Sequence, residues 1–181
     1  MGIVRNQSIK NSISFYIGMA IGAINILFVY PNVFDDDPEK FGLIQIIIAY
    51  SLVISTITTL GVPKTFIKFF PSIKNKAQLY LFSFVVPFIG FLIALLFYLF
   101  FEDLIYQILN VNDLLKENFF YIILLVFFIG FYEVLTSISR SFLSAVTPNL
   151  INEVFLKLYS FTILILYWYN FFNFSAFLFL Y

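Results

Sequence analysis

Long stretches without a charged side chain divide the sequence, and their lengths predict its elements. Uncharged runs of 24, 23 and 25 residues occupy positions 11–34, 41–63 and 77–101. A fourth run, 118–139, is interrupted by one charge, and a fifth, 150–169, by two charges near its start. The hydrocarbon core of a bilayer is about 30 Å thick, and a helix needs about 20 apolar residues to cross it. Each run is therefore long enough to cross a membrane once.

Uninterrupted apolar stretches inside these runs decide between helices and a β-barrel. Residues 43–49 and 92–97 lack the alternation of apolar and polar positions that a barrel strand shows. Backbone N–H and C=O groups in hydrocarbon must pair within their own segment, which leaves the helix. We therefore predict an all-α, polytopic transmembrane helical bundle. The predicted spans are 12–30, 42–62, 79–101, 118–139 and 150–169, followed by a truncated sixth run at 174–181.

The composition agrees with a membrane protein and narrows the available chemistry. Of the 181 residues, 62% are hydrophobic and 11% are charged, whereas a soluble domain has about 25% charged residues. Ten basic and ten acidic residues give no net charge, so the positive surface of a nucleic-acid binder is not expected. Cysteine and histidine do not occur, which excludes thiolate zinc sites, Cys nucleophiles and imidazole chemistry. We expect neither an enzyme nor a cofactor or metal site.

The distribution of basic residues predicts the orientation in the membrane. If the N-terminus is cytoplasmic and each run crosses once, eight of the ten basic residues lie on inner segments. Only Lys40 and Lys116 then lie outside. Cytoplasmic loops carry an excess of Lys and Arg. The predicted topology is therefore N-terminus inside, with loops 35–39 and 102–117 outside.

Four stretches of sequence, taken together, resemble a known family. They are residues 3–11 (IVRNQSIKN), 16–25 (YIGMAIGAIN), 61–71 (GVPKTFIKFFP) and 140–153 (RSFLSAVTPNLINE). They resemble the N-terminal part of bacterial polysaccharide-biosynthesis flippases, in the multidrug/oligosaccharidyl-lipid/polysaccharide exporter superfamily. The resemblance runs over essentially the whole chain. It implies two pseudo-symmetric helical lobes around a central cavity, and transport of a lipid-linked oligosaccharide of the undecaprenyl-diphosphate type across the bacterial inner membrane.

Five spans and a short sixth run are fewer than one lobe of this family implies. Eight helical residues at 174–181 rise only about 12 Å, which is too little to cross a bilayer. We therefore expect residues 1–181 to be a partial N-terminal transmembrane lobe that depends on the remaining half of the transporter. The alternatives are a drug or metabolite antiporter of the same superfamily and a non-transporting membrane anchor or assembly subunit. A membrane-embedded sugar polymerase or transferase is disfavoured, because the longest polar loop, 102–118, is too short for a domain.

Small and polar residues mark one face of the first predicted span. Gly18 and Gly22 lie four residues apart, and Asn25 continues the same face. Helices in lipid approach closely where such small residues meet, so Gly18 and Gly22 are predicted helix-packing positions, with self-dimerisation as the alternative. An amide deep in a span is costly without a partner. Asn25 is therefore expected either to hydrogen-bond another helix or to line a substrate cavity.

Several charged residues within or beside the spans are candidates for transport. Glu133 lies inside the fourth span and is a candidate ion-coupling carboxylate. The alternatives are a structural pair with Arg140, seven residues further along the same face, and a side chain that reaches water near the cytoplasmic third of the span. Lys68 and Arg140 adjoin apolar spans and are candidate substrate contacts, because a diphosphate needs ammonium or guanidinium donors. Insertion into the membrane also selects basic residues there. Glu153 and Lys157, four residues apart, are expected to form a structural ion pair.

Overall fold

The computed structural model of the protein describes residues 2–142 and 146–181. Every element in these two ranges is a helix, which confirms the predicted all-α class. Five helical segments are long and apolar enough to cross a membrane, which is consistent with a multi-pass membrane protein. These segments are Arg5–Val33, Pro38–Thr58, Lys76–Ile108, Phe119–Ser141 and Val146–Trp168.

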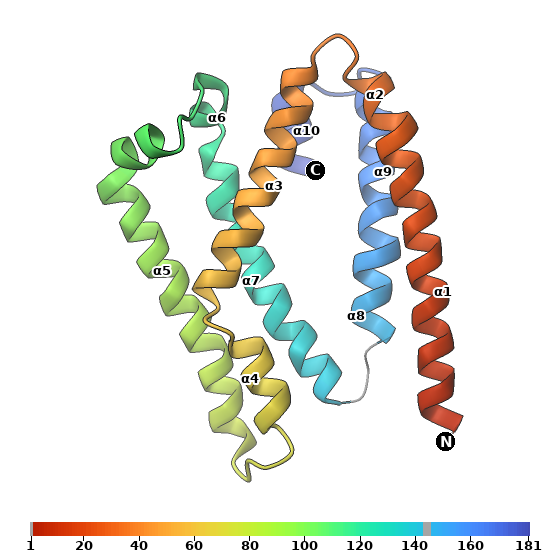
Figure 1. Cartoon of the computed structure of the whole chain (residues 1–181), viewed down its shortest axis with the longest axis vertical. Helices are drawn as coiled ribbons and strands as arrows, with labels where there is room; N and C mark the ends of the chain where they lie inside the picture. Colours follow the sequence, from red (N-terminus) through yellow and green to blue (C-terminus); the bar gives the residue numbers. More distant parts are fainter. Residues whose placement is uncertain (1, 143–145) are drawn as a thin grey trace. The chain divides into compact units, whose positions relative to one another are not determined.

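The helices form two compact units, each built from segments that pack on one another (Figure 1). Unit 1 comprises the described residues up to Gly42 and from Val146 onward, and unit 2 comprises Leu43–Phe142. Two short segments, labelled η, are turns of π-helix in which the backbone bond joins residues five apart. In order, the elements are α1 (Gly2–Ile24), η1 (Asn25–Val29), α2 (Tyr30–Val33), α3 (Pro38–Thr58), α4 (Val62–Phe69), α5 (Lys76–Ile108), α6 (Asp113–Glu117), α7 (Phe119–Ser141), α8 (Val146–Leu150), η2 (Ile151–Phe155), α9 (Leu156–Trp168) and α10 (Phe174–Leu180).

Unit 1 consists of two continuous helical segments packed along their length, with a short helix at one end (Figure 1). The first is α1 with η1 and α2, and the second is α8 with η2 and α9. The short helix α10 folds back onto α9 and buries Phe177 completely. The ring of Phe177 lies 4.7 Å from that of Tyr167 and 5.9 Å from that of Phe34, measured between centroids. The apolar run predicted at 174–181 is thus a helix held by aromatic packing.

Unit 2 contains a helix that breaks partway along its course. Leu60 and Gly61 have φ angles of 49° and 71°, in the left-handed region that ends α3. Glycine adopts this region without a steric cost, and a proline in the first turn, Pro63, is suited to begin the next helix. The chain continues as α4, which packs on α5 and α7 and buries Phe66. The stretch 61–71, which follows the second predicted span, is therefore largely helical.

The longest helix, α5, bends near its end and not at its proline. Pro87 lies inside α5 and is buried, and the helix continues through it. Helical angles are lost instead at Phe101, where φ is −123° and ψ is 25°. The chain then turns at Asn110, whose φ is 47°, and Asn112 caps α6 by accepting a hydrogen bond of 3.0 Å from the Leu115 N–H. This bend carries the charged residues that follow Phe101 away from the axis of α5.

Small residues bring α3 close to its neighbours in unit 2. Ser51 is fully buried and donates to the Ile122 carbonyl of α7 at 3.3 Å, in addition to its own helix. Gly90 of α5 lies directly against the Thr58 carbonyl, where a Cβ atom would have no room. Close approach at small residues is the usual way for helices to associate in lipid. The contact between Thr58 and Gly90 fixes where α3 and α5 meet.

Candidate functional site

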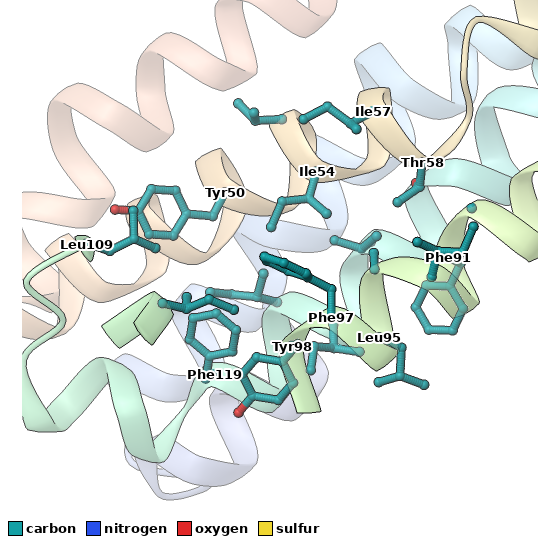
Figure 2. Close-up of a pocket in the computed structure, with 18 of the residues that line it drawn as sticks. Tyr50, Ile54, Ile57, Thr58, Phe91, Leu95, Phe97, Tyr98, Leu109 and Phe119 are labelled. Carbon is teal, nitrogen blue, oxygen red and sulfur yellow. The ribbon is translucent and has the colours of Figure 1, made fainter. Parts of the chain in front are cut away.

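An apolar cavity of about 720 Å³ lies in unit 2 between α3, α5 and α7 (Figure 2). It begins where the Thr58 carbonyl meets Gly90, and the facing sides of α3 and α5 line it from there onward. Ile122 and Val126 of α7 form part of its wall. The residues labelled in Figure 2 are Tyr50, Ile54, Ile57, Thr58, Phe91, Leu95, Phe97, Tyr98, Leu109 and Phe119.

Tyrosine hydroxyls mark the end of the cavity opposite Thr58. Figure 2 shows Tyr50 and Tyr98 at the end where Leu109 and Phe119 lie. The ring of Tyr98 stacks on that of Phe119, with centroids 4.7 Å apart and planes inclined by 7°. This end therefore combines aromatic walls with polar atoms, whereas the rest of the lining is almost wholly hydrocarbon.

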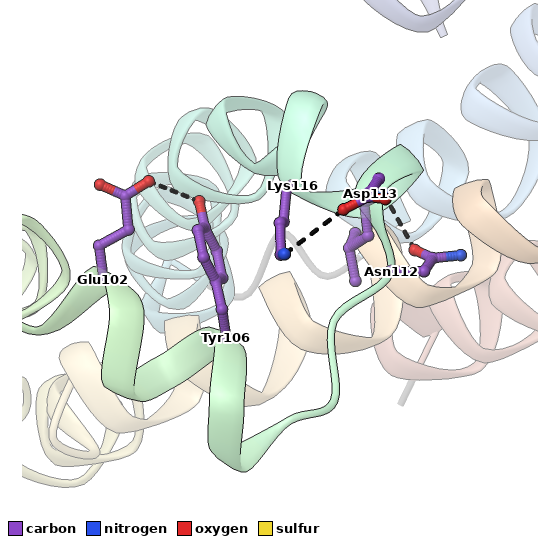
Figure 3. Close-up of polar contacts among 6 residues, drawn as sticks. Glu102, Tyr106, Asn112, Asp113 and Lys116 are labelled. Atoms are coloured by element: carbon purple, nitrogen blue, oxygen red, sulfur yellow. Dashed lines mark hydrogen bonds and ion pairs between the residues drawn. The ribbon is translucent and has the colours of Figure 1, made fainter.

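A carboxylate extends this polar end beyond the cavity. Glu102 accepts a hydrogen bond at its Oε1 from the Tyr106 hydroxyl at 2.8 Å (Figure 3). The same oxygen accepts one from the Tyr98 hydroxyl at 3.3 Å, and the two hydroxyl oxygens are 2.9 Å apart. Lys116 pairs with Asp113 at 3.4 Å, and its Nζ lies 5.8 Å from the centre of the Tyr106 ring. The contact between Lys116 and the Tyr106 ring joins the end of α5 to α6.

The basic candidates occupy a different end of unit 2. The rings of Phe70, after α4, and Phe142, after α7, touch edge to face with centroids 5.0 Å apart. Lys68 and Arg140 each stand two residues before one of these rings, so both belong to the same end of the unit, and both are exposed. The Lys76 side chain already has partners at this end, since its Nζ donates to the Phe70 carbonyl at 2.7 Å and lies over the Phe70 ring.

Glu133 lies half-buried in α7, apart from both ends. Among the residues that the structure describes, ion pairs join Lys40 to Asp37, Lys116 to Asp113 and Lys157 to Glu153. None of these three pairs joins Glu133 to Arg140. One turn after Glu133, the Thr136 hydroxyl is buried and makes no hydrogen bond within the described residues. Glu133 thus has a polar neighbour but no counter-ion from α7.

The glycine face of α1 packs against the second helical segment of unit 1. Gly18 lies against the Glu153 carbonyl so closely that no Cβ would fit, and Gly22 lies beside the Lys157 side chain. Asn25 is buried and donates from Nδ2 to the Lys157 carbonyl at 3.2 Å. The expected ion pair between Lys157 and Glu153 is present, with Nζ and Oε2 2.7 Å apart. Of the two expectations for Asn25, the structure has the interhelical hydrogen bond.

The candidate residues therefore fall into two groups. Asn25, with its glycines, belongs to unit 1, whereas Lys68, Glu133 and Arg140 belong to unit 2. Within the described ranges, no group of three or more acidic side chains is arranged to hold a metal ion.

Sequence reasoning missed the cavity and the cluster of Tyr98, Glu102 and Tyr106. The spacing of four between these residues was the available signal for the cluster, because residues four apart share a helix face. No pattern in the local sequence predicted the cavity, because it forms where Thr58 of α3 contacts Gly90 of α5. Comparisons with protein-family models, with curated proteins and with solved structures found no match for the chain.

Proposed function

We propose that the chain is part of a bacterial inner-membrane transporter that flips a lipid-linked oligosaccharide for polysaccharide synthesis. In this proposal it supplies helices of the N-terminal lobe, with its N-terminus in the cytoplasm. The observation that carries the proposal is the shared end of Lys68 and Arg140, which the contact between Phe70 and Phe142 fixes beside long apolar helices. The sequence resemblance to polysaccharide flippases supports the same function.

The chemistry of that end suits a diphosphate attached to a lipid. The Arg140 guanidinium offers donors in a planar fork that can bind a phosphate at two points, and the Lys68 ammonium adds a mobile point charge. Both side chains are exposed, as contact with a headgroup at the membrane surface requires. The neighbouring helices α5 and α7 are apolar enough to remain in hydrocarbon. A substrate with a charged head and a long apolar chain matches this combination.

The test removes the charges of Lys68 and Arg140 from the full-length protein that the gene encodes. Lys68→Gln, Arg140→Gln and the double variant are compared with Lys116→Gln, which removes a basic group in unit 2 outside this end. We expect each single variant to lower surface glycan and the translocation of a fluorescent lipid-linked oligosaccharide in vesicles. The Lys116→Gln variant should remain close to the parent. Normal glycan and translocation in the double variant, at unchanged expression, would rule out the substrate role of this end.

A further inference from the structure

The cavity of unit 2 has an opening and a depth that suit a hydrocarbon chain. Its lining residues on α3 and α5 include Ile57 and Ile93, which remain 64% and 63% exposed. Both helices are candidate membrane spans, so the medium at this level is lipid hydrocarbon and not water. An apolar hollow that opens sideways into a bilayer is filled by the chains around it.

The depth of the cavity corresponds to one leaflet of the membrane. Gly90 and Tyr98 are eight residues apart on α5, and Tyr50 and Thr58 are eight residues apart on α3. Eight helical residues rise about 12 Å, and half of a hydrocarbon core of about 30 Å is about 15 Å. The charged Glu102 follows Tyr98 by one turn and belongs at the membrane surface. The cavity therefore runs from that surface toward the middle of the bilayer.

The charges at the tyrosine end determine which headgroup fits. Four acidic residues and one basic residue lie between the bend at Phe101 and the end of α6; these are Glu102, Asp103, Asp113, Glu117 and Lys116. Lys116 is already paired with Asp113. Glu102 is exposed, and among the described residues its hydrogen bonds all reach Oε1, which leaves Oε2 available. An anionic headgroup is disfavoured here, and an ammonium is favoured.

We propose that the cavity between α3, α5 and α7 binds one acyl chain of an aminophospholipid from the surrounding bilayer, with the headgroup ammonium at Glu102. The tyrosine rings of the polar end then lie at the level of the headgroup, where tyrosine is enriched in membrane proteins. This lipid site is independent of the proposed transport function, because it lies at the acidic end of the unit and requires no oligosaccharide.

Native mass spectrometry of the whole chain, stripped of lipid in detergent, tests the proposal. The probes are phosphatidylethanolamine and phosphatidylglycerol with identical acyl chains, and undecaprenyl phosphate. We expect one phosphatidylethanolamine per chain, bound about tenfold more tightly than phosphatidylglycerol, as one charge-assisted hydrogen bond provides. Preferential binding of either anionic lipid would overturn the proposal, and so would a dimer that binds no lipid.

Three variants separate the chain site from the headgroup site. Ala94 lines the cavity, so the ring added by Ala94→Phe should obstruct it and abolish lipid retention. Ala77 is exposed on the same helix outside the cavity, and Ala77→Phe should retain the lipid. Glu102→Gln should bind the two phospholipids equally well. Retention by Ala94→Phe with parental helix content, or an unchanged preference in Glu102→Gln, would count against the site.

A cross-linking measurement on the unmodified chain does not depend on how the variants fold. Phosphatidylethanolamine with a photoreactive group midway along one acyl chain is added to the chain in bilayer vesicles. We expect the label on cavity residues such as Ile57, Ile93 and Phe97. Equal labelling of exposed apolar residues outside the cavity, such as Leu81 and Phe82, would contradict a specific site.

Discussion

Replacing the two glycines of α1 one at a time tests how unit 1 is held together. A Cβ at Gly18 would lie well inside van der Waals distance of the Glu153 carbonyl oxygen, a backbone atom that cannot rotate away. A Cβ at Gly22 would lie 3.6 Å from the Lys157 Cδ, an ordinary contact with a flexible side chain. The two substitutions are chemically identical and one turn apart. Gly22→Ala is therefore a matched control for Gly18→Ala.

The expected difference follows from these two contacts. Alanine favours a helix over glycine by about 1 kcal/mol, and this gain is the same at both positions and cancels. Forcing an extra carbon into a packed contact costs about 1 to 3 kcal/mol, and a rigid backbone partner places Gly18→Ala near the upper end. Separation of the helices would also strain the hydrogen bond from Asn25 to Lys157. The free energy of unfolding of Gly18→Ala should thus be lower than that of Gly22→Ala by about 2 to 3 kcal/mol.

The single tryptophan makes this measurement direct. Trp168 is the only tryptophan of the chain and closes α9, within unit 1. Its fluorescence, followed while sodium dodecyl sulfate is titrated into dodecyl maltoside micelles, reports the loss of structure at the end of α9 as unit 1 unfolds. We expect the transition of Gly18→Ala at a lower detergent fraction than that of the parent, and Gly22→Ala at an equal or higher one. Coincident transitions for the two variants would refute the packing described for this pair.

Three further predictions concern unit 2. Gly90→Ala should lower the free energy of unfolding by about 1 to 3 kcal/mol, because the added Cβ would clash with the Thr58 carbonyl. Gly42→Ala should not lower it, because a Cβ at Gly42 meets nothing within 4 Å. Unfolding in mixed micelles compares the stabilities of the two variants. Glu133→Gln should abolish ion-driven translocation in vesicles and leave binding of the lipid-linked substrate unchanged, and full ion coupling would exclude it as the coupling carboxylate. Lys74→Cys, in a chain without other cysteines, should react with an impermeant maleimide only after the cells are permeabilised.

Features that depend on neighbours along the chain could be predicted from the sequence. A charged side chain in hydrocarbon is energetically costly, so the spacing of charges along the sequence located the long helices. The pair of Glu153 and Lys157 was predictable because residues four apart meet on a helix face. The end of the second span near Gly61 and Pro63 was predictable, but the left-handed angle of Leu60 could not be foreseen, since leucine is not a residue that signals such a turn. The cavity could not be foreseen either, because it requires that α3 and α5 meet at one pair of small contacts.

Each of the two packed helical segments of unit 1 contains one π turn, and these turns affect how residues can rotate around the helix axis. The Tyr30 N–H bonds to the Asn25 carbonyl, and the Leu156 N–H bonds to the Ile151 carbonyl, five residues back in each case. Each turn holds one residue more than an α-helical turn. If such an extra residue moves along a helix, every residue that it passes rotates by about 100° around the axis, while the helix ends keep their places. Such a shift would turn the face that α9 presents to α1 without any sliding of one helix along the other.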